Sequence, residues 1–168
     1  MGSLVQVRVL GVARDSLGQH LILLKPLTEP AGQGRVLPIW IGPQEATSIL
    51  MAVEGVEAPR PLSHDLMKTL LAAVGAQVER IEVTRIDDGT FYAEIMLLTR
   101  EGREVIDARP SDAVALACRV DATIWVADAV LDEAGIPDET ERAADTEEEK
   151  LEEFKRFLDE VDPEDFQG

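Results

Sequence analysis

The stretch VERIEVTRIDDGTFYAEIMLLT, residues 78–99, predicts the central strands of the fold. It contains two runs rich in β-branched and aromatic residues, 78–86 and 91–99, on either side of Asp88–Gly89. An Asp-Gly pair favours a tight two-residue hairpin turn because both of its positions adopt positive φ. The stretch therefore predicts two antiparallel strands that lie next to each other in a sheet.

Further β-rich runs lie on both sides of this hairpin in the sequence. In the first of them, Val5, Val7 and Val9 alternate with polar residues, which is the period of a half-buried strand. The additional strands that we expect are 5–9, 21–24, 35–41, 103–108 and 123–126. The first two are separated by a polar segment with a glycine, so we expect them to form a second hairpin.

Three helices are expected between these strands, because capping residues or prolines precede apolar segments of helical period. They begin at Gly42–Pro43, Ser63 and Pro110. The second helix carries the following residues on the side that we expect to be buried: Leu66, Met67, Leu70, Leu71 and Val74. The order β-β-β-α-α-β-β-β-α-β predicts an α+β fold, with helices packed on a largely antiparallel or mixed sheet.

The chain divides by charge into two parts. Its 168 residues include 33 acids and 16 bases, which give a net charge of −17. Residues 1–127 hold 16 acids and 12 bases, hence −4, whereas residues 128–168 hold 17 acids and 4 bases, hence −13. We therefore expect one domain at 1–135 and an acidic linker with an amphipathic C-terminal helix at 136–168. This balance disfavours bulk attraction to a phosphate backbone, but it leaves nucleic acid open as a partner of the nearly neutral body.

The expected C-terminal helix has an apolar face that needs a partner. Its apolar residues are Leu151, Phe154, Phe157, Leu158 and Val161. This face could dock on its own body, on another copy of the chain or in a groove of a protein partner.

The sequence also predicts the compartment. Cys118 is the single cysteine, so no intramolecular disulfide can form, which is typical of a reducing compartment. No apolar run approaches the roughly 20 residues that a membrane span requires. We therefore expect a cytoplasmic protein without a membrane partner.

The starts of the three expected helices carry the residues best suited to chemistry. These segments are 41–45, 60–65 and 107–112, and the last two share Arg-Pro followed by Ser and Asp. Free backbone N–H groups, serine hydroxyls and arginine side chains at a helix start suit a phosphate or carboxylate group. We therefore expect the substrate to be bound by Arg60, Ser63, Arg109 and Ser111.

Acidic residues at the same helix starts allow two interpretations. The carboxylates of Glu45, Asp65, Asp107 and Asp112 could hold a divalent cation such as Mg²⁺ or Mn²⁺. His64 could act as a general base or as a ligand. An acid in the first turn of a helix is, however, also stabilised by about 0.3–1 kcal/mol through the helix dipole alone. No metal-binding motif of fixed spacing and no Gly-x-Ser-x-Gly elbow is present, so neither a metal centre nor a Ser-His-Asp site follows from motifs.

The two tryptophans of the chain end β-rich stretches. Trp40 stands next to the predicted helix start at Gly42–Pro43, and Trp125 lies in the last expected strand. Aromatic residues at such positions usually anchor the packing of a core. We therefore expect both to be packing anchors rather than platforms for base stacking.

Three blocks of the chain together resemble one protein family. They are LPIWIGPQEA (37–46), RPLSHDL (60–66) and ARPSDAVALA (108–117), and DGTFYA (88–93) lies between the last two. In this order and spacing they resemble the bifunctional nuclease domain family over about residues 5–135, and the acidic tail resembles those of some bacterial members. The resemblance implies a cytosolic α+β domain that cleaves phosphodiester bonds in DNA or RNA. Its motif positions correspond to Glu45, Arg60, Ser63, His64, Asp65, Arg109, Ser111 and Asp112.

Residues and resemblance together predict a metal-assisted nuclease. In this hypothesis Arg60 and Arg109 bind phosphate, and the expected catalytic residues are Glu45, His64, Asp65 and Asp112, with Glu45, Asp65 and Asp112 as metal ligands. The competing hypothesis is a non-enzymatic regulatory module that binds an anion at the helix starts and a protein through its tail. Self-association is expected in either case, because exposed sheet edges and an amphipathic helix need covering.

Overall fold

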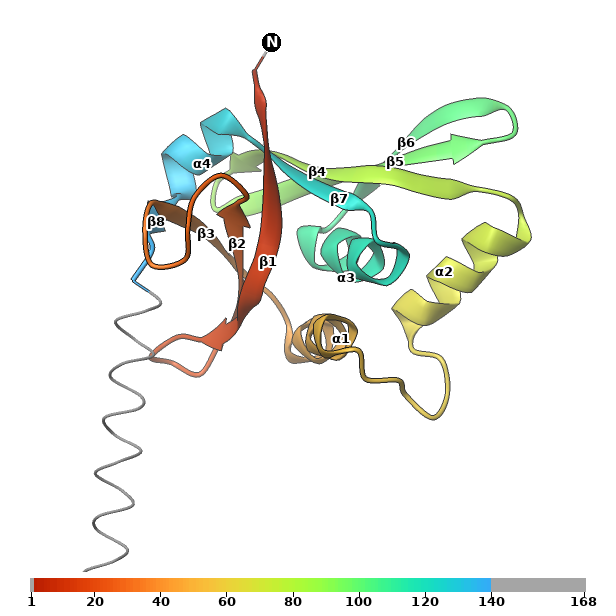
Figure 1. Cartoon of the computed structure of the whole chain (residues 1–168), viewed down its shortest axis with the longest axis horizontal. Helices are drawn as coiled ribbons and strands as arrows, with labels where there is room; N and C mark the ends of the chain where they lie inside the picture. The colour runs from red at the N-terminus through yellow and green to blue at the C-terminus, as the bar shows by residue number, and fades with distance from the viewer. Residues whose placement is uncertain (1, 140–168) are drawn as a thin grey trace, which may run out of the picture.

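A computed structural model describes residues 2–139 of the chain. These residues form a sheet of eight strands together with four helices (Figure 1). The elements are β1 (Leu4–Arg14), β2 (His20–Pro26), β3 (Arg35–Trp40), α1 (Pro43–Glu54), α2 (Ser63–Ala73), β4 (Gln77–Asp87), β5 (Thr90–Thr99), β6 (Gly102–Ala108), α3 (Pro110–Val120), β7 (Thr123–Ala127), α4 (Asp128–Ala134) and β8 (Ile136–Pro137). The expected C-terminal helix lies outside the described residues.

The predicted order of strands and helices is confirmed as far as β7. Two short elements, α4 and β8, then complete the described chain. With seven and two residues, they are too short to produce a recognisable periodic pattern in the sequence. None of the helices described here has the length and apolar character needed to cross a membrane.

The sheet is mixed, because it contains one parallel pair of strands. Its strand order is β6-β5-β4-β7-β1-β2-β3-β8, in which β4 and β7 are parallel and the other neighbours are antiparallel. Between β4 and β7 the chain forms β5 and β6 and then returns through α3. The α+β class with a mixed sheet is thereby confirmed.

The hairpin of β4 and β5 forms as its turn sequence predicts. Asp87 pairs with Thr90, and Asp88 and Gly89 between them have φ values of 50° and 77°. Both turn positions therefore lie in the left-handed region, as a two-residue turn of this kind requires.

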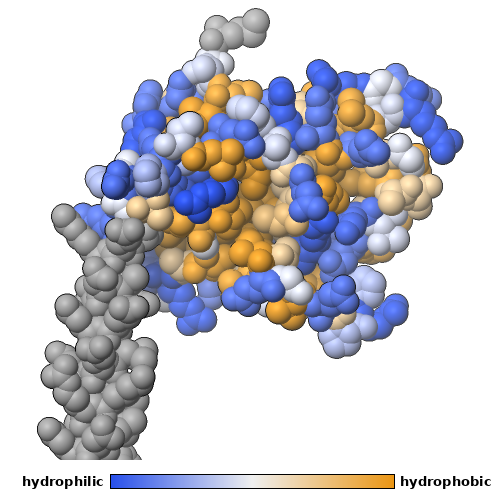
Figure 2. Space-filling view, in the orientation of Figure 1, coloured by the Kyte–Doolittle hydropathy of each residue, from blue (hydrophilic) through white to orange (hydrophobic). Residues whose placement is uncertain are grey.

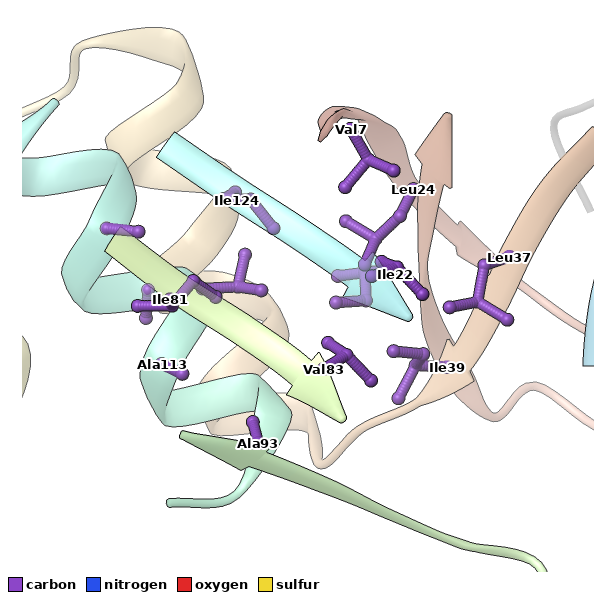
Figure 3. Packing of buried hydrophobic residues seen from close by; sticks show 14 of the residues in the cluster. Val7, Ile22, Leu24, Leu37, Ile39, Ile81, Val83, Ala93, Ala113 and Ile124 are labelled. Atoms are coloured by element: carbon purple, nitrogen blue, oxygen red, sulfur yellow. The ribbon is translucent and has the colours of Figure 1, made fainter. Parts of the chain in front are cut away.

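The hydrophobic core lies between the sheet and α3 (Figure 3). Ile81 and Val83 of β4 and Ile124 of β7 belong to the same buried cluster as Ala113 of α3. The buried positions of α3 are Pro110, Ser111, Ala113, Val114, Ala115, Leu116 and Ala117. Because most of these side chains are small, the helix can pack close to the strands. This packing fixes the place of the amino-terminal end of α3.

Helix α2 differs from the prediction. Leu66, Leu70 and Val74 are 51%, 57% and 66% exposed, although their spacing predicts a buried face. The helix packs mainly against α3, and His64 is its one buried residue. An amphipathic pattern identifies the apolar face of a helix but not what covers it, and among residues 2–139 nothing covers this face.

A buried ion pair ties the end of the described chain to β2. Lys25 Nζ lies 2.7 Å from Asp138 Oδ2, and both side chains are fully buried. Lys25 also donates to the carbonyl oxygen of Gln33, and Asp138 accepts from the N–H of Gly32. Because β8 also pairs with β3, Ile136, Pro137 and Asp138 are held against the strands β2 and β3.

Removing the acidic partner of this pair should destabilise the fold strongly. Asp138→Ala leaves the Lys25 ammonium group buried without its counter-charge, so we expect the free energy of unfolding to fall by about 3–5 kcal/mol. The matched control is Asp132→Ala, which breaks an exposed pair with Arg35 and should cost less than about 1 kcal/mol. Urea unfolding of the full chain measures both values, and equal losses would contradict the importance of the buried pair.

Candidate functional site

The amino-terminal ends of α1, α2 and α3 meet beside a cavity of about 540 Å³. Proline is the first residue of both α1 and α3, where its fixed φ suits the helix and its missing N–H costs no hydrogen bond. The side chains that line this cavity come from all three ends and include Glu45, Ser48, Ser63, His64, Arg109 and Asp112. The local sequence at each helix start thus places polar groups around one space.

Arg109 joins the start of α3 to α1. It is the residue before the helix, and its Nε lies 3.0 Å from Asp112 Oδ2. Its Nη2 lies 3.0 Å from Glu45 Oε1 on α1. Hydrogen bonds to Asp112 and then to Glu45 raise the pKa of Arg109 above its ordinary value. The guanidinium is nevertheless accessible, because 65% of the side chain is exposed.

His64 continues this network into the interior. Its Nε2 lies 2.9 Å from Asp112 Oδ1, and its Nδ1 lies 2.7 Å from Ser48 Oγ. Partial burial favours a higher pKa for Asp112, but hydrogen bonds from His64 and Arg109 lower the pKa below its ordinary value. The ionised carboxylate can only accept, so Nε2 carries the proton, and in the neutral ring the Ser48 hydroxyl donates to Nδ1. A Ser-His-Asp series is therefore present, although no sequence motif predicts it.

Asp65 belongs to a separate ion pair behind this network. Its Oδ1 accepts from Arg119 Nε at 2.7 Å, and its Oδ2 accepts from the N–H of Leu62 at 2.9 Å. These two hydrogen bonds, the one from Arg119 first, lower the pKa of Asp65. Arg119 also donates to the carbonyl oxygen of Ser48, so the pair links α2, α3 and α1.

The structure brings four of the predicted residues into one connected network: Glu45, His64, Arg109 and Asp112. Ser63 lines the same cavity, but it is the first residue of α2, and Leu62 occupies the capping position that the sequence assigns to Ser63. Position at a helix start therefore predicts which residues come together, but it does not predict the structural role of each residue.

Three other predicted residues lie apart from this network. Asp65 is held by Arg119, and Arg60 is an exposed residue of the loop before α2 that does not line the cavity. Ser111 is buried and lines a second cavity, which Arg109 shares. The similar local sequences around Arg60 and Arg109 thus have different surroundings.

The predicted metal ligands are not gathered around one position. Glu45 and Asp112 both bind the guanidinium of Arg109, whereas Asp65 binds Arg119. Within residues 2–139, no three His, Cys, Asp or Glu side chains are placed to hold an ion. Because each of the three carboxylates already faces an arginine, this set does not fit a divalent cation, which needs several free oxygen ligands.

Helix-start reasoning does not find Ser48 of the network or Arg119 of the neighbouring ion pair. Ser48 follows Glu45 by three residues on α1, and Arg119 follows Asp112 by seven residues on α3. Residues three or seven positions apart lie on the same face of a helix. Helical spacing from the predicted residues would therefore have identified both.

Acid titration should reveal the pair of Asp65 and Arg119. Because the pKa of Asp65 is lowered in the folded chain, the unfolded chain takes up this proton first as the pH falls. The stabilisation is present above the ordinary carboxyl pKa of about 4 and is lost below it. Free energies of unfolding measured from neutral pH downward should therefore fall less steeply in Asp65→Asn than in the native chain. The control Glu57→Gln, in the exposed loop after α1, should leave the dependence of the free energy of unfolding on pH as it is in the native chain. The native dependence on pH in Asp65→Asn would contradict this account.

Comparison with known proteins shows relatives along most of the chain. An uncharacterized protein of Mycobacterium tuberculosis is 43% identical over 167 residues, which cover 97% of this chain and 98% of that protein. Bifunctional nuclease 1 of Arabidopsis thaliana is 28% identical over 98 residues, and Bifunctional nuclease 2 of the same plant is 28% identical over 99 residues. Each plant match covers 56% of this chain and 30% of the plant protein.

A family model gives the broader assignment. The model of the Bifunctional nuclease domain matches residues 26–139, which include the starts of α1, α2 and α3 and the whole network described above. The matched range covers more than half of the chain. The chain therefore belongs to the bifunctional nuclease domain family.

Proposed function

We propose that this chain is a nuclease that hydrolyses phosphodiester bonds in DNA or RNA at the cavity beside the three helix starts. The observation that carries the proposal is the hydrogen-bonded series Ser48–His64–Asp112–Arg109, which begins at a hydroxyl and ends at an exposed guanidinium. Family membership and the similarity to the plant proteins named bifunctional nucleases support a nucleic-acid substrate.

Arg109 would bind the scissile phosphate. Its Nε donates to Asp112 and its Nη2 donates to Glu45, while its Nη1 has no hydrogen-bond partner among residues 2–139. An orientated guanidinium suits phosphate oxygens because its N–H groups form a planar fork. The two carboxylates would fix the direction of that fork and reduce the entropy lost on binding.

His64 would accept a proton from Ser48, the hydroxyl that already donates to it. In this scheme Ser48 Oγ bonds to phosphorus, the P–O bond to the leaving nucleoside oxygen breaks, and His64 gives its proton to that oxygen. Asp112 would stabilise the imidazolium ion formed in between. Water would then bond to phosphorus and give a proton to His64, the bond between phosphorus and Ser48 Oγ would break, and His64 would return the proton to Ser48 Oγ.

The remaining sequence-based expectations stay predictions. Dependence on Mg²⁺ or Mn²⁺ is one of them, and no step of the scheme above uses a cation. A cytoplasmic location, self-association and a protein partner of the C-terminal segment are others. The assay below includes both metals because a cation carried by the substrate could assist cleavage.

A second candidate function is a non-enzymatic module that binds an anion. It is favoured by the pairing of the charges at the site, because Glu45 and Asp112 share Arg109 and both nitrogens of His64 are already bonded. Such a network could hold the three helices together without catalysing a reaction. In that case Arg109 would bind phosphate groups, and Ser48 would be a structural hydrogen-bond donor.

Cleavage assays with matched variants test the proposal. The purified full chain is incubated with single-stranded DNA, duplex DNA and RNA, each with Mg²⁺, Mn²⁺ or a chelator. We expect cleavage that falls by about 100-fold or more in Ser48→Ala and His64→Ala, because the hydroxyl or its proton acceptor is lost. The control Thr47→Ala removes an exposed neighbouring hydroxyl and should keep the native rate. Circular dichroism confirms that each variant folds.

The outcomes separate the two candidate functions. Native rates in folded Ser48→Ala and His64→Ala would contradict the assigned roles. Absence of cleavage by the native chain on every substrate would favour the anion-binding module. Cleavage at the same rate by all chains would indicate a contaminating nuclease.

A further inference from the structure

A second and larger cavity adjoins the proposed catalytic site. Its volume is about 700 Å³, and Arg109 belongs to the lining of both cavities. A volume of this size is typical of sites for small organic ligands. Trp40 lines this cavity from the end of β3, and Phe91 lines it from the start of β5. Two aromatic side chains and the Arg109 side chain thus line one cavity.

Trp40 is not the packing anchor that its place in the sequence suggests. The residue is 53% exposed, and its indole Nε1 donates to Asp15 Oδ2 at 3.0 Å. Asp15 also accepts from the N–H groups of Leu17 and Gln19, so it is itself held by the turn after β1. The polar edge of the indole is therefore satisfied and fixed, while much of its apolar surface remains open to a ligand.

We propose that this cavity binds a single unstacked nucleobase on Trp40 while Arg109 holds the adjacent phosphate. The proposal rests on the proposed nuclease function and names the form of its substrate, a single-stranded nucleic acid. A base inside a duplex is covered by its neighbours on both faces, whereas an unpaired base can stack on an aromatic ring. Stacking tolerates any base because every base has a π-face, so the cavity predicts weak sequence preference.

Tryptophan fluorescence can test this subsite separately from cleavage. The chain has two tryptophans, and Trp125 lies on β7 between the buried residues Ile124 and Val126, so that its side chain points to the other face of the sheet. Trp125→Phe keeps Trp40 as the single tryptophan, and Trp40→Phe keeps Trp125. Both proteins are titrated with a short oligothymidylate and with a duplex of equal length, and each sample is then examined for cleavage.

We expect the oligothymidylate to quench the fluorescence of Trp125→Phe but not that of Trp40→Phe. Trp40→Ala should weaken binding of the single strand by about 10-fold, and the duplex should bind the native chain more weakly than the single strand. Cleavage without quenching of Trp40, or native affinity in Trp40→Ala, would overturn the base subsite and leave the nuclease proposal standing. Failure of every nucleic acid to bind would overturn both proposals.

A different part of the molecule carries a second inference. The exposed face of α2 continues onto the sheet as an apolar groove of about 350 Å³. The groove is lined by Met67, Leu70, Leu71, Val74, Ile95, Leu97, Ile106 and Leu116. Figure 2 shows hydrophobic side chains at the surface on this side of the molecule. Contiguous apolar surface of this kind usually marks an interaction site in a folded domain.

The groove borders an unpaired sheet edge. Among the strands that the structure describes, β6 is the first of the sheet and pairs on one side only, with β5. Val105 and Ile106 of β6 are exposed, and each belongs to a different face of the sheet because side chains alternate along a strand. An edge strand with free N–H and C=O groups and apolar side chains can pair with a strand of another chain.

The charges along β6 indicate a second copy of the chain as the occupant. If β6 pairs with its own copy about a two-fold axis through Val105, Arg103 lies opposite Asp107 of the other copy. Arg103 binds Glu79 within its own chain, whereas Asp107 has no ion pair among residues 2–139. Directly opposed residues of opposite charge stabilise an antiparallel pair.

We infer that the chain forms a symmetric dimer through β6, with the apolar faces of the two α2 helices on one side of the joined sheet. The axis is perpendicular to the sheet, so both grooves lie side by side on the same face of the joined sheet, where apolar residues of one copy can pack against those of the other. The described chain ends just after β8, at the edge of the sheet opposite β6.

Charge reversal tests this dimer. Sedimentation of the full chain over a range of concentrations should give a monomer–dimer equilibrium. Asp107→Arg places like charges opposite each other and should raise the dissociation constant of the dimer by about 10-fold. The double variant Arg103→Asp with Asp107→Arg places opposite charges there again and should restore the native dissociation constant. The control Asp87→Arg, at the hairpin turn, should leave it unchanged.

Three results would overturn the dimer through β6. These are a monomeric native chain at every concentration, a native dissociation constant in Asp107→Arg, and a dimer that disappears only when residues 140–168 are removed. The last of these would assign the contact to the C-terminal segment instead.

Discussion

The close packing of α3 on the sheet is the constraint on which the site depends. Small buried side chains such as Ala113 and Ala117 allow this helix to lie against the central strands, so its amino-terminal end has one possible position. Arg109 and Asp112 are placed there by α3. The links from α1 and α2 to that end are polar and come from Glu45, Ser48 and His64. Ile49 of α1 belongs to the same hydrophobic core, so apolar packing holds both α1 and α3, and the polar links align their amino-terminal ends with that of α2.

The charges of the site are neutralised over short distances. Arg109 faces two carboxylates, and Arg119 faces a third. A site of this kind creates little long-range field, and the body carries a small negative charge, so attraction of a polyanion from a distance contributes little. Recognition of the proposed substrate would then depend on contacts made after encounter, namely directed hydrogen bonds and aromatic stacking. This agrees with a substrate whose bases are accessible rather than with the smooth surface of a duplex.

Local sequence rules predict much of this fold, and they fail where the answer depends on distant residues. The turn at Asp88–Gly89 and the prolines at the starts of α1 and α3 act through their own backbone preferences, so they could be recognised directly. Asp65 and Asp112 occupy similar positions in similar motifs, yet only Asp112 meets His64 and Arg109, because the loop before α2 and the packed start of α3 have different neighbours. The exposure of the apolar face of α2 could not be predicted for the same reason, because periodicity does not specify what a helix packs against.

The parallel pairing of β4 with β7 governs the order in which the chain can fold. The hairpins β1–β2 and β4–β5 are local and can form early, because their partners are close in sequence. β7 can join β4 only after the segment containing β5, β6 and α3 has been arranged beside them, and it must then also pair with β1 from the other end of the chain. Such distant contacts carry a large loop-closure entropy. We therefore expect the rate-limiting step of folding to be the insertion of β7, the strand that joins the amino-terminal and carboxy-terminal halves into one sheet.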